Sequence, residues 1–113
     1  MSILEELNLI LDELKIPCAT GIYKAPVPKE YAVFVPLADS YPLNGNDMPL
    51  VDLNEVRISF FTKGNYRNKT QSIVRELLHR DFTITDRKYV DYEESTGYHH
   101  YAIEVAKLYE MEE

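Results

Sequence analysis

Residues 54–81, NEVRISFFTKGNYRNKTQSIVRELLHRD, decide the fold because the spacing of the apolar side chains changes partway along this stretch. From 56 to 60 every second residue is apolar, which predicts a strand with one face toward a core and leaves Phe61 among charged neighbours on the other face. Gly64 and Asn65 break this strand. From 73 to 78 the apolar residues recur at helical spacing, so we expect a helix that packs on the sheet.

The residues before this unit predict a helix and two strands. Ser2 and Glu5 have the spacing of a capping box and a stripe of Ile and Leu follows them, so we expect a helix that Pro17 ends. Residues 19–37 predict a turn with a short edge strand, and then the strand YAVFVPL. This strand is apolar on both faces, so we expect it to be covered on both sides or to lie centrally in the sheet. Residues 38–52 contain two prolines and the turn-forming NGND, and predict a long loop or an open hairpin.

The residues after this unit predict two long strands joined by a turn. The first covers residues 82–94, with an irregularity at positions 85 and 86. The second covers residues 98–109, and its odd-numbered residues from 101 to 105 should face the core.

The element order is therefore helix, strand, strand, strand, helix, strand, strand, in a single domain over residues 1–113. This order predicts an α+β fold with a largely antiparallel sheet of four to five strands and two helices packed against it. At least one edge of such a sheet remains available for pairing with another chain.

The chain has no pattern of catalytic or cofactor-binding residues, and we expect neither an enzyme nor a bound cofactor. His99 and His100 are neighbours on a predicted strand, so their side chains should point to opposite faces and cannot share one metal ion. His79 lies on the second predicted helix, and Cys18 is expected to be a small buried apolar residue. No ligand spacing is present, so the sequence predicts no metal site.

Charge is distributed unevenly along the chain. The net charge of −7 speaks against free-standing, sequence-independent binding of nucleic acid. Residues 57–88 nevertheless carry eight Lys or Arg against three acids, whereas the remaining segments are acidic. This asymmetry would suit two ordinary solvated faces. It would also suit a head-to-tail contact in which the basic surface of one copy meets the acidic surface of the next. No leader sequence and no apolar run of membrane-spanning length is present, so we expect a protein made in the cytoplasm with no membrane partner.

Five segments together resemble one family of structural proteins. They are the helix ending at KIPCATGIY, the strand EYAVFVPLADSY, the loop PLNGNDMPL, the unit EVRISFFTKGNYRNKTQSIVRELLHRDFTITD and the ending YEESTGYHHYAIEVAKLYE. Over nearly the whole chain they resemble the tail-terminator proteins of long-tailed bacteriophages and prophages, also called tail-completion or head-tail joining proteins. The chain departs from that family in its acidic tail and in His100, which stands where a basic residue is common.

The resemblance implies a non-enzymatic role in virion assembly. Several copies, with six expected, would form a ring that caps the tail tube and joins the tail to the DNA-filled head. The implied partners are the chain itself, the tail tube protein and the head-tail connector proteins. Genome DNA would pass through the channel without specific binding. The resemblance thus implies a location in the virion, at the head-tail interface.

Two groups of residues are our candidates for contacts with neighbouring subunits or with the tube. The first group lies in the polar loop and the second on the exposed side of the second helix, where exposed polar and charged side chains can reach another molecule. The candidates are Tyr41, Asn44, Asn46, Asp47, Arg67, Lys69 and Arg75.

Two other classes of function stay open at the level of sequence. One is a small acidic decoy or inhibitor that binds a basic protein partner, which a one-sided array of carboxylates would favour. The other is a small enzyme or metal protein that uses His79, His99 or His100, which binding of metal with a change in melting temperature would favour.

Overall fold

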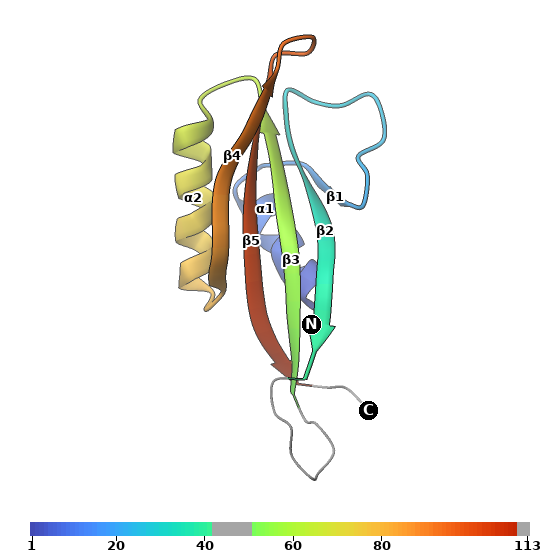
Figure 1. The fold of residues 1–113 in the computed structure, drawn as a ribbon, viewed down its shortest axis with the longest axis vertical. Helices are drawn as coiled ribbons and strands as arrows, with labels where there is room; N and C mark the ends of the chain where they lie inside the picture. Colours follow the sequence, from blue (N-terminus) through green and yellow to red (C-terminus); the bar gives the residue numbers. More distant parts are fainter. Residues whose placement is uncertain (42–50, 111–113) are drawn as a thin grey trace.

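The computed structural model describes residues 1–41 and 51–110, and these form a five-stranded sheet with two helices (Figure 1). The predicted α+β class and the predicted element order are both confirmed. No helix in these residues is long and apolar enough to span a membrane. The elements are α1 (Ile3–Glu13), β1 (Cys18–Thr20), β2 (Glu30–Ser40), β3 (Val51–Thr62), α2 (Tyr66–His79), β4 (Thr83–Glu93) and β5 (Tyr98–Glu110).

The strand order in the sheet is β1-β2-β3-β5-β4. The four long strands pair antiparallel, as the sequence predicted, and the short β1 adds a parallel pairing to β2, so the sheet is mixed. Strand β3 lies at the centre, because both of its neighbours, β2 and β5, pair along most of its length. The strand predicted from residues 54–64 is therefore the central strand of the sheet, on which β2 and β5 pair.

Local signals in the sequence set the bounds of the two helices. The predicted capping box at the start of α1 is confirmed: the Ser2 hydroxyl accepts from the Glu5 backbone at 3.2 Å, and the Glu5 carboxylate accepts from the Ser2 backbone at 3.1 Å. The Asn65 side chain caps α2 in a similar way. The prediction that Pro17 ends α1 is wrong, because the helix ends at Glu13 and Lys15 already has a left-handed backbone with φ of 60°.

Both helices pack on the same face of the sheet, and the core lies between them and the strands. Side chains from α1, α2 and the inward rows of β2, β3 and β5 form one buried cluster. The largest fully buried members are Leu7, Ile10, Leu11, Phe34, Ile58, Phe60, Ile73, Leu77 and Ile103. The odd-numbered residues of β5 face this core, as predicted, although Tyr101 is only partly buried.

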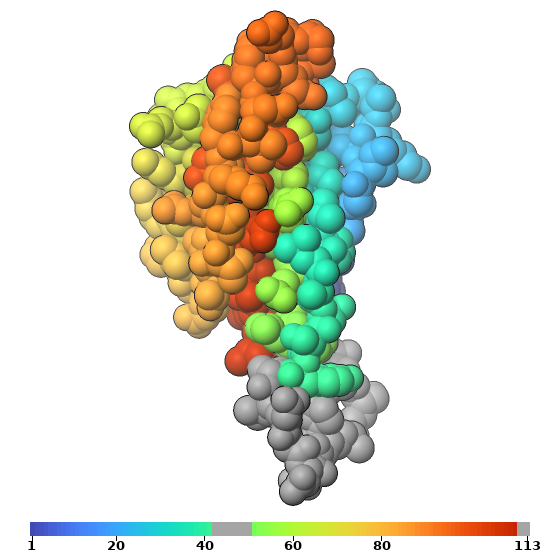
Figure 2. All heavy atoms as spheres, viewed as in Figure 1, coloured from blue at the N-terminus to red at the C-terminus, as the bar shows by residue number. Residues whose placement is uncertain are grey.

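The opposite face of the sheet has no helix over it, and this face is turned to the viewer in Figure 2. Strand β2 was expected to be covered on both faces or to lie centrally, and the second placement holds, because β2 lies between β1 and β3. Ala32 and Phe34 are buried in the core, whereas Val33 is only half-buried on the open face. The apolar side chains that β2 places on the open face before Pro36 are half-buried, because neighbouring side chains partly cover them.

An aromatic row crosses the open face from strand to strand. Phe61 is not left among charges, as the sequence suggested, because its ring stacks on Tyr31 at 4.9 Å and on His100 at 4.3 Å between ring centroids. The partners come from β2 and β5, which pair directly with Phe61 on β3. Only the register of three strands brings these rings together, and the local sequence around Phe61 does not show it.

Both edges of the sheet are interrupted. On one side, β1 covers only part of β2, and beyond it come Pro36, which has no N–H to offer, and a register shift at Leu37. On the other side, β4 carries two register shifts, at Thr85 as predicted and at Val90. The proline and the register shifts reduce pairing of a sheet edge with another chain. The available edge expected from the sequence is therefore protected against such pairing.

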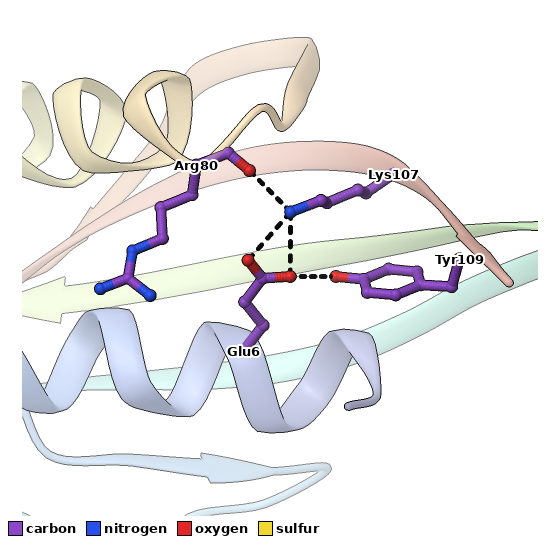
Figure 3. A network of polar contacts seen from close by, with 4 residues as sticks. All are labelled: Glu6, Arg80, Lys107 and Tyr109. Carbon is purple, nitrogen blue, oxygen red and sulfur yellow. Dashed lines mark hydrogen bonds and ion pairs between the residues drawn. The ribbon is translucent and has the colours of Figure 1, made fainter.

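A polar network fixes α1 to β5 and to the end of α2 (Figure 3). The Lys107 ammonium donates to both oxygens of Glu6, at 3.0 and 2.9 Å, and to the backbone carbonyl of Arg80 at 2.6 Å. The Tyr109 hydroxyl donates to Glu6 at 2.7 Å. Burial would raise the pKa of Glu6, but the hydrogen bonds from Lys107 and Tyr109 outweigh it, and the pKa lies below its ordinary value. Every charge in this network has a partner.

Candidate functional site

A polar hollow of about 310 Å³ lies between the first turns of α2 and the strands β4 and β5. Helix α2 contributes side chains from its first two turns, β4 contributes Arg87 and Tyr89, and β5 contributes Tyr101. The residues that line it are Tyr66, Arg67, Thr70, Gln71, Arg87, Tyr89 and Tyr101.

The register shift at Thr85 places an arginine in this hollow. Ile84 pairs with Val105 and faces the core, so strict alternation would turn Asp86 toward the helices as well. The extra residue reverses the alternation: Asp86 pairs with Glu104 on the open face, and Arg87 pairs with Ile103 on the helix side. The bulge thus puts a positive charge beside α2 where a regular strand would put a negative one.

The two arginines of the hollow have no charged partner in the part of the chain that the structure describes. Neither guanidinium, of Arg67 or of Arg87, forms an ion pair or a hydrogen bond there. Other basic residues of the chain are paired: Arg57 with Glu104 at 2.8 Å, and Arg80 with Glu13 at 2.7 Å. Two unpaired guanidinium groups around one hollow give it a positive potential in a chain whose net charge is −7.

Aromatic rings form the remaining wall of the hollow. Tyr66 lies 5.1 Å from Tyr89 and 6.2 Å from Tyr101 between ring centroids. His99 packs behind them, with its Nδ1 at 2.8 Å from the Tyr89 hydroxyl. His99 and His100 do point to opposite faces, as the sequence predicted, and His99 supports the wall of the hollow.

An acidic site lies toward the other end of the sheet. The Asn54 amide nitrogen donates to Asp39 at 2.7 Å and to Asp52 at 3.0 Å, and so holds two carboxylates beside each other. Arg87 pairs with Ile103 on β5, and Ile103 pairs with Ile58 on β3. Along β3, Asp52 therefore lies six residues from the level of Arg87. At the rise of an extended strand this is about 20 Å. The basic hollow and the acidic site of one chain therefore cannot touch each other.

The structure brings one of the seven predicted contact residues into the hollow. Arg67 lines it, whereas Lys69 pairs with Glu30 at 3.5 Å and Arg75 is exposed farther along α2. Tyr41 is exposed at the end of β2, close in sequence to Asp39. The predicted contacts Asn44, Asn46 and Asp47 lie outside the described residues.

Sequence reasoning missed Arg87 and the three tyrosines of the hollow. The sequence places Arg87 on a predicted strand among several basic residues and does not indicate which face of the strand it occupies. The irregularity predicted at Thr85 and Asp86 was the available signal, because one inserted residue exchanges the two faces of the strand. The tyrosines had no such signal, since their meeting depends on how α2 lies over β4 and β5.

The aromatic row on the open face is centred on Phe61. Its ring stacks on Tyr31 at one side and on His100 at the other, so Phe61 has no free face on which a nucleic-acid base could stack. Burial lowers the pKa of His100 against the opposing effect of Asp91, and the ring stays neutral at neutral pH. We regard this row as support for the sheet.

The remaining candidates for chemistry are dispersed. In residues 1–41 and 51–110 no three His, Cys, Asp or Glu side chains are placed to hold a metal ion. Cys18 is half-buried and donates to the Asn8 side chain at 3.1 Å, so it is not the purely apolar residue expected from the sequence, and burial raises its pKa. In comparisons with known proteins, no family model matches the chain and no curated protein matches it.

Proposed function

We propose that this chain is a structural subunit of a long-tailed phage or prophage, and that several copies form a ring that caps the tail tube and joins it to the head. The sequence resemblance supports this role. The observation that carries it furthest is the separation of unlike charges: Arg67 and Arg87 are unpaired around one hollow, and Asp39 and Asp52 lie together at a distant site.

A ring requires two different surfaces on each subunit, because each copy contacts the next through a head-to-tail interface. Chains with a net charge of −7 repel one another at long range, and local opposite charges at an interface counteract this repulsion. The basic hollow and the acidic site provide such a pair on one small subunit. Six copies are proposed on the resemblance alone.

The proposed partners follow from this role. Besides its own copies, the chain would contact the tail tube protein on one side and head-tail connector proteins on the other. Genome DNA would pass through the ring without specific binding. Tyr41 and the polar loop after it are proposed to reach the tube or a neighbouring subunit, and the proposed location is the virion.

The alternative of an acidic decoy has weaker support. A decoy needs an array of free carboxylates on one side, but several acids here are paired with basic residues: Glu6 with Lys107, Glu13 with Arg80 and Glu104 with Arg57. An unpaired basic hollow is also a poor surface for approach to a basic partner. A non-enzymatic assembly role accounts for more of the surface.

The proposal is tested by deleting the coding sequence from the phage or prophage that carries it. We expect filled heads and separate tails in electron micrographs, and a return to joined virions when the wild-type chain is supplied in trans. Normal numbers of joined virions after deletion would contradict the proposed function.

A further inference from the structure

The basic hollow lacks an acidic partner within the described part of the single chain, and the acidic site lacks a basic one. Arg67 and Arg87 border one hollow and have no acidic partner among the described residues. Asp39 and Asp52 both accept from the Asn54 amide and have no basic partner among those residues. Contact between the two sites would give the guanidinium groups and the carboxylates partners of opposite charge.

We propose that the hollow between α2 and β4 is a receptor for carboxylates, and that its occupant is the Asp39–Asp52 site of a second copy of this chain. This inference rests on the proposed function only for the size of the assembly. The contact itself is a property of the isolated protein.

The donors around the hollow suit carboxylates. A guanidinium group presents a planar set of N–H donors that matches a carboxylate with two parallel hydrogen bonds. Gln71 and the hydroxyls of Tyr66 and Tyr101 also line the hollow and make no hydrogen bond with another described residue. Two carboxylates entering the hollow would therefore meet two cations and up to three neutral donors.

Aromatic rings border the arginines on one side of the hollow. Tyr66, Tyr89 and Tyr101 form this wall, and Tyr66 lies 5.1 Å from Tyr89 and 6.2 Å from Tyr101 between ring centroids. Arg67 and Arg87 themselves are exposed. The contact therefore depends on several donors acting together, since a single exposed ion pair contributes little.

Carboxylates of a protein fit this hollow better than phosphates of nucleic acid. Binding to a duplex requires a row of cations along the phosphate backbone. Beyond the two arginines, the nearest basic side chain on β4 is Lys88, and it lies on the open face, where it pairs with Asp86 at 3.7 Å. The net charge of −7 also opposes a polyanion more than it opposes a small acidic site.

The test uses two charge-reversal variants of the full chain. The first, Arg67→Glu with Arg87→Glu, removes the receptor. The second, Asp39→Lys with Asp52→Lys, removes the occupant. A matched control, Lys24→Glu with Lys29→Glu, makes the same change in net charge as the first variant at exposed positions outside the hollow. Circular dichroism and urea unfolding establish that each variant folds.

Sedimentation velocity then measures association up to about 1 mM, where contacts of about −4 kcal/mol are detected. We expect the wild type and the control to form multimers, and each reversal variant alone to associate at least about 100-fold more weakly. Mixed in equal amounts, the two variants should associate again, because the acidic site of the first variant meets the intact hollow of the second and the two reversed sites also carry opposite charges. That result would establish a head-to-tail contact.

Three outcomes would overturn the inference: a monomeric wild type up to about 1 mM, reversal variants that assemble like the wild type, or a mixture that does not associate. A monomeric wild type that binds a duplex oligonucleotide, with the binding lost in the Arg67→Glu, Arg87→Glu variant, would assign the hollow to nucleic acid. The proposed role in the virion is tested separately by deletion, so either proposal can fail while the other stands.

Discussion

The same chain uses charge in opposite ways at its two polar centres. Around Glu6, Lys107 and Tyr109 every charged or polar group has a partner, and the network binds α1 to β5 (Figure 3). Around Arg67 and Arg87 the charged groups have none within the described part of the chain. Polar groups with partners inside the subunit stabilise its fold, whereas charged groups without such partners can form ion pairs with another molecule. Substitutions in the first should therefore alter folding, and those in the second should alter association.

Replacing Lys107 should have the largest effect on folding. Lys107→Met leaves the Glu6 carboxylate, of which the side chain is only 14% exposed, without its ammonium partner. We expect a loss of about 2 to 3 kcal/mol in the free energy of unfolding, measured by urea denaturation. The control is Lys88→Met, since the Lys88–Asp86 pair is 57% and 47% exposed, and it should change stability by less than about 0.5 kcal/mol. Equal effects of the two variants would show that the part-buried network contributes no more to folding than an exposed ion pair does.

Removing the Tyr109 hydroxyl should have a smaller effect in the same network. Tyr109→Phe keeps the ring and removes the donor that lies 2.7 Å from Glu6. We expect a loss of about 1 kcal/mol in the free energy of unfolding. Burial and then the Glu6 carboxylate raise the pKa of Tyr109 well above its ordinary value. The Tyr109 hydroxyl therefore keeps its proton, and can donate it to Glu6, throughout the neutral pH range. An unchanged free energy of unfolding would show that the hydroxyl adds nothing to the network.

The Glu6 carboxylate should also make stability depend on acid. Its pKa is lowered in the folded chain, so its contribution is fully present above the ordinary value of 4.5 and is lost as the pH falls through the folded pKa. Urea denaturation at a series of pH values should show this loss in the wild type and a smaller loss in Glu6→Gln. The same slope in both proteins would assign the acid sensitivity to other carboxylates.

His100 should give a separate dependence on pH, because burial lowers its pKa below the ordinary value of 6.5. The unfolded chain then binds a proton more readily than the folded chain, so stability should fall as the pH drops below 6.5. His100→Phe keeps the stack on Phe61 and replaces an Nε2 atom that is buried without a partner among the described residues. This variant should flatten the pH dependence in that window, and a persistent slope would exclude His100 as its source.

The smallest effect on folding is expected from the basic hollow. Arg67→Gln with Arg87→Gln removes two unpaired charges and should leave the free energy of unfolding within about 0.5 kcal/mol of the wild type. Urea denaturation at low protein concentration checks this value. A loss as large as that of Lys107→Met would show that the arginines serve the fold.

How far the sequence predicted this molecule depends on the range of the interactions. Strand β3, helix α2 and the capping box of α1 were predictable because alternation, helical spacing and caps act within a few residues. The stack of Phe61 between Tyr31 and His100 was not, because it needs the register of three strands. The hollow was predictable in part. The sequence predicted the bulge in β4, but the bulge moves Arg87 to the helix side of the sheet only through the register of β4 on β5.

We propose that two unlike charged sites on one subunit join copies head to tail into a closed ring. Light scattering after size exclusion, with negative-stain images of the largest species, measures this assembly. We expect one closed species with an open centre, of six copies as the resemblance implies, which dissociates at high salt as its ion pairs are screened. A two-fold dimer as the largest species, or an assembly that salt does not affect, would contradict the proposal.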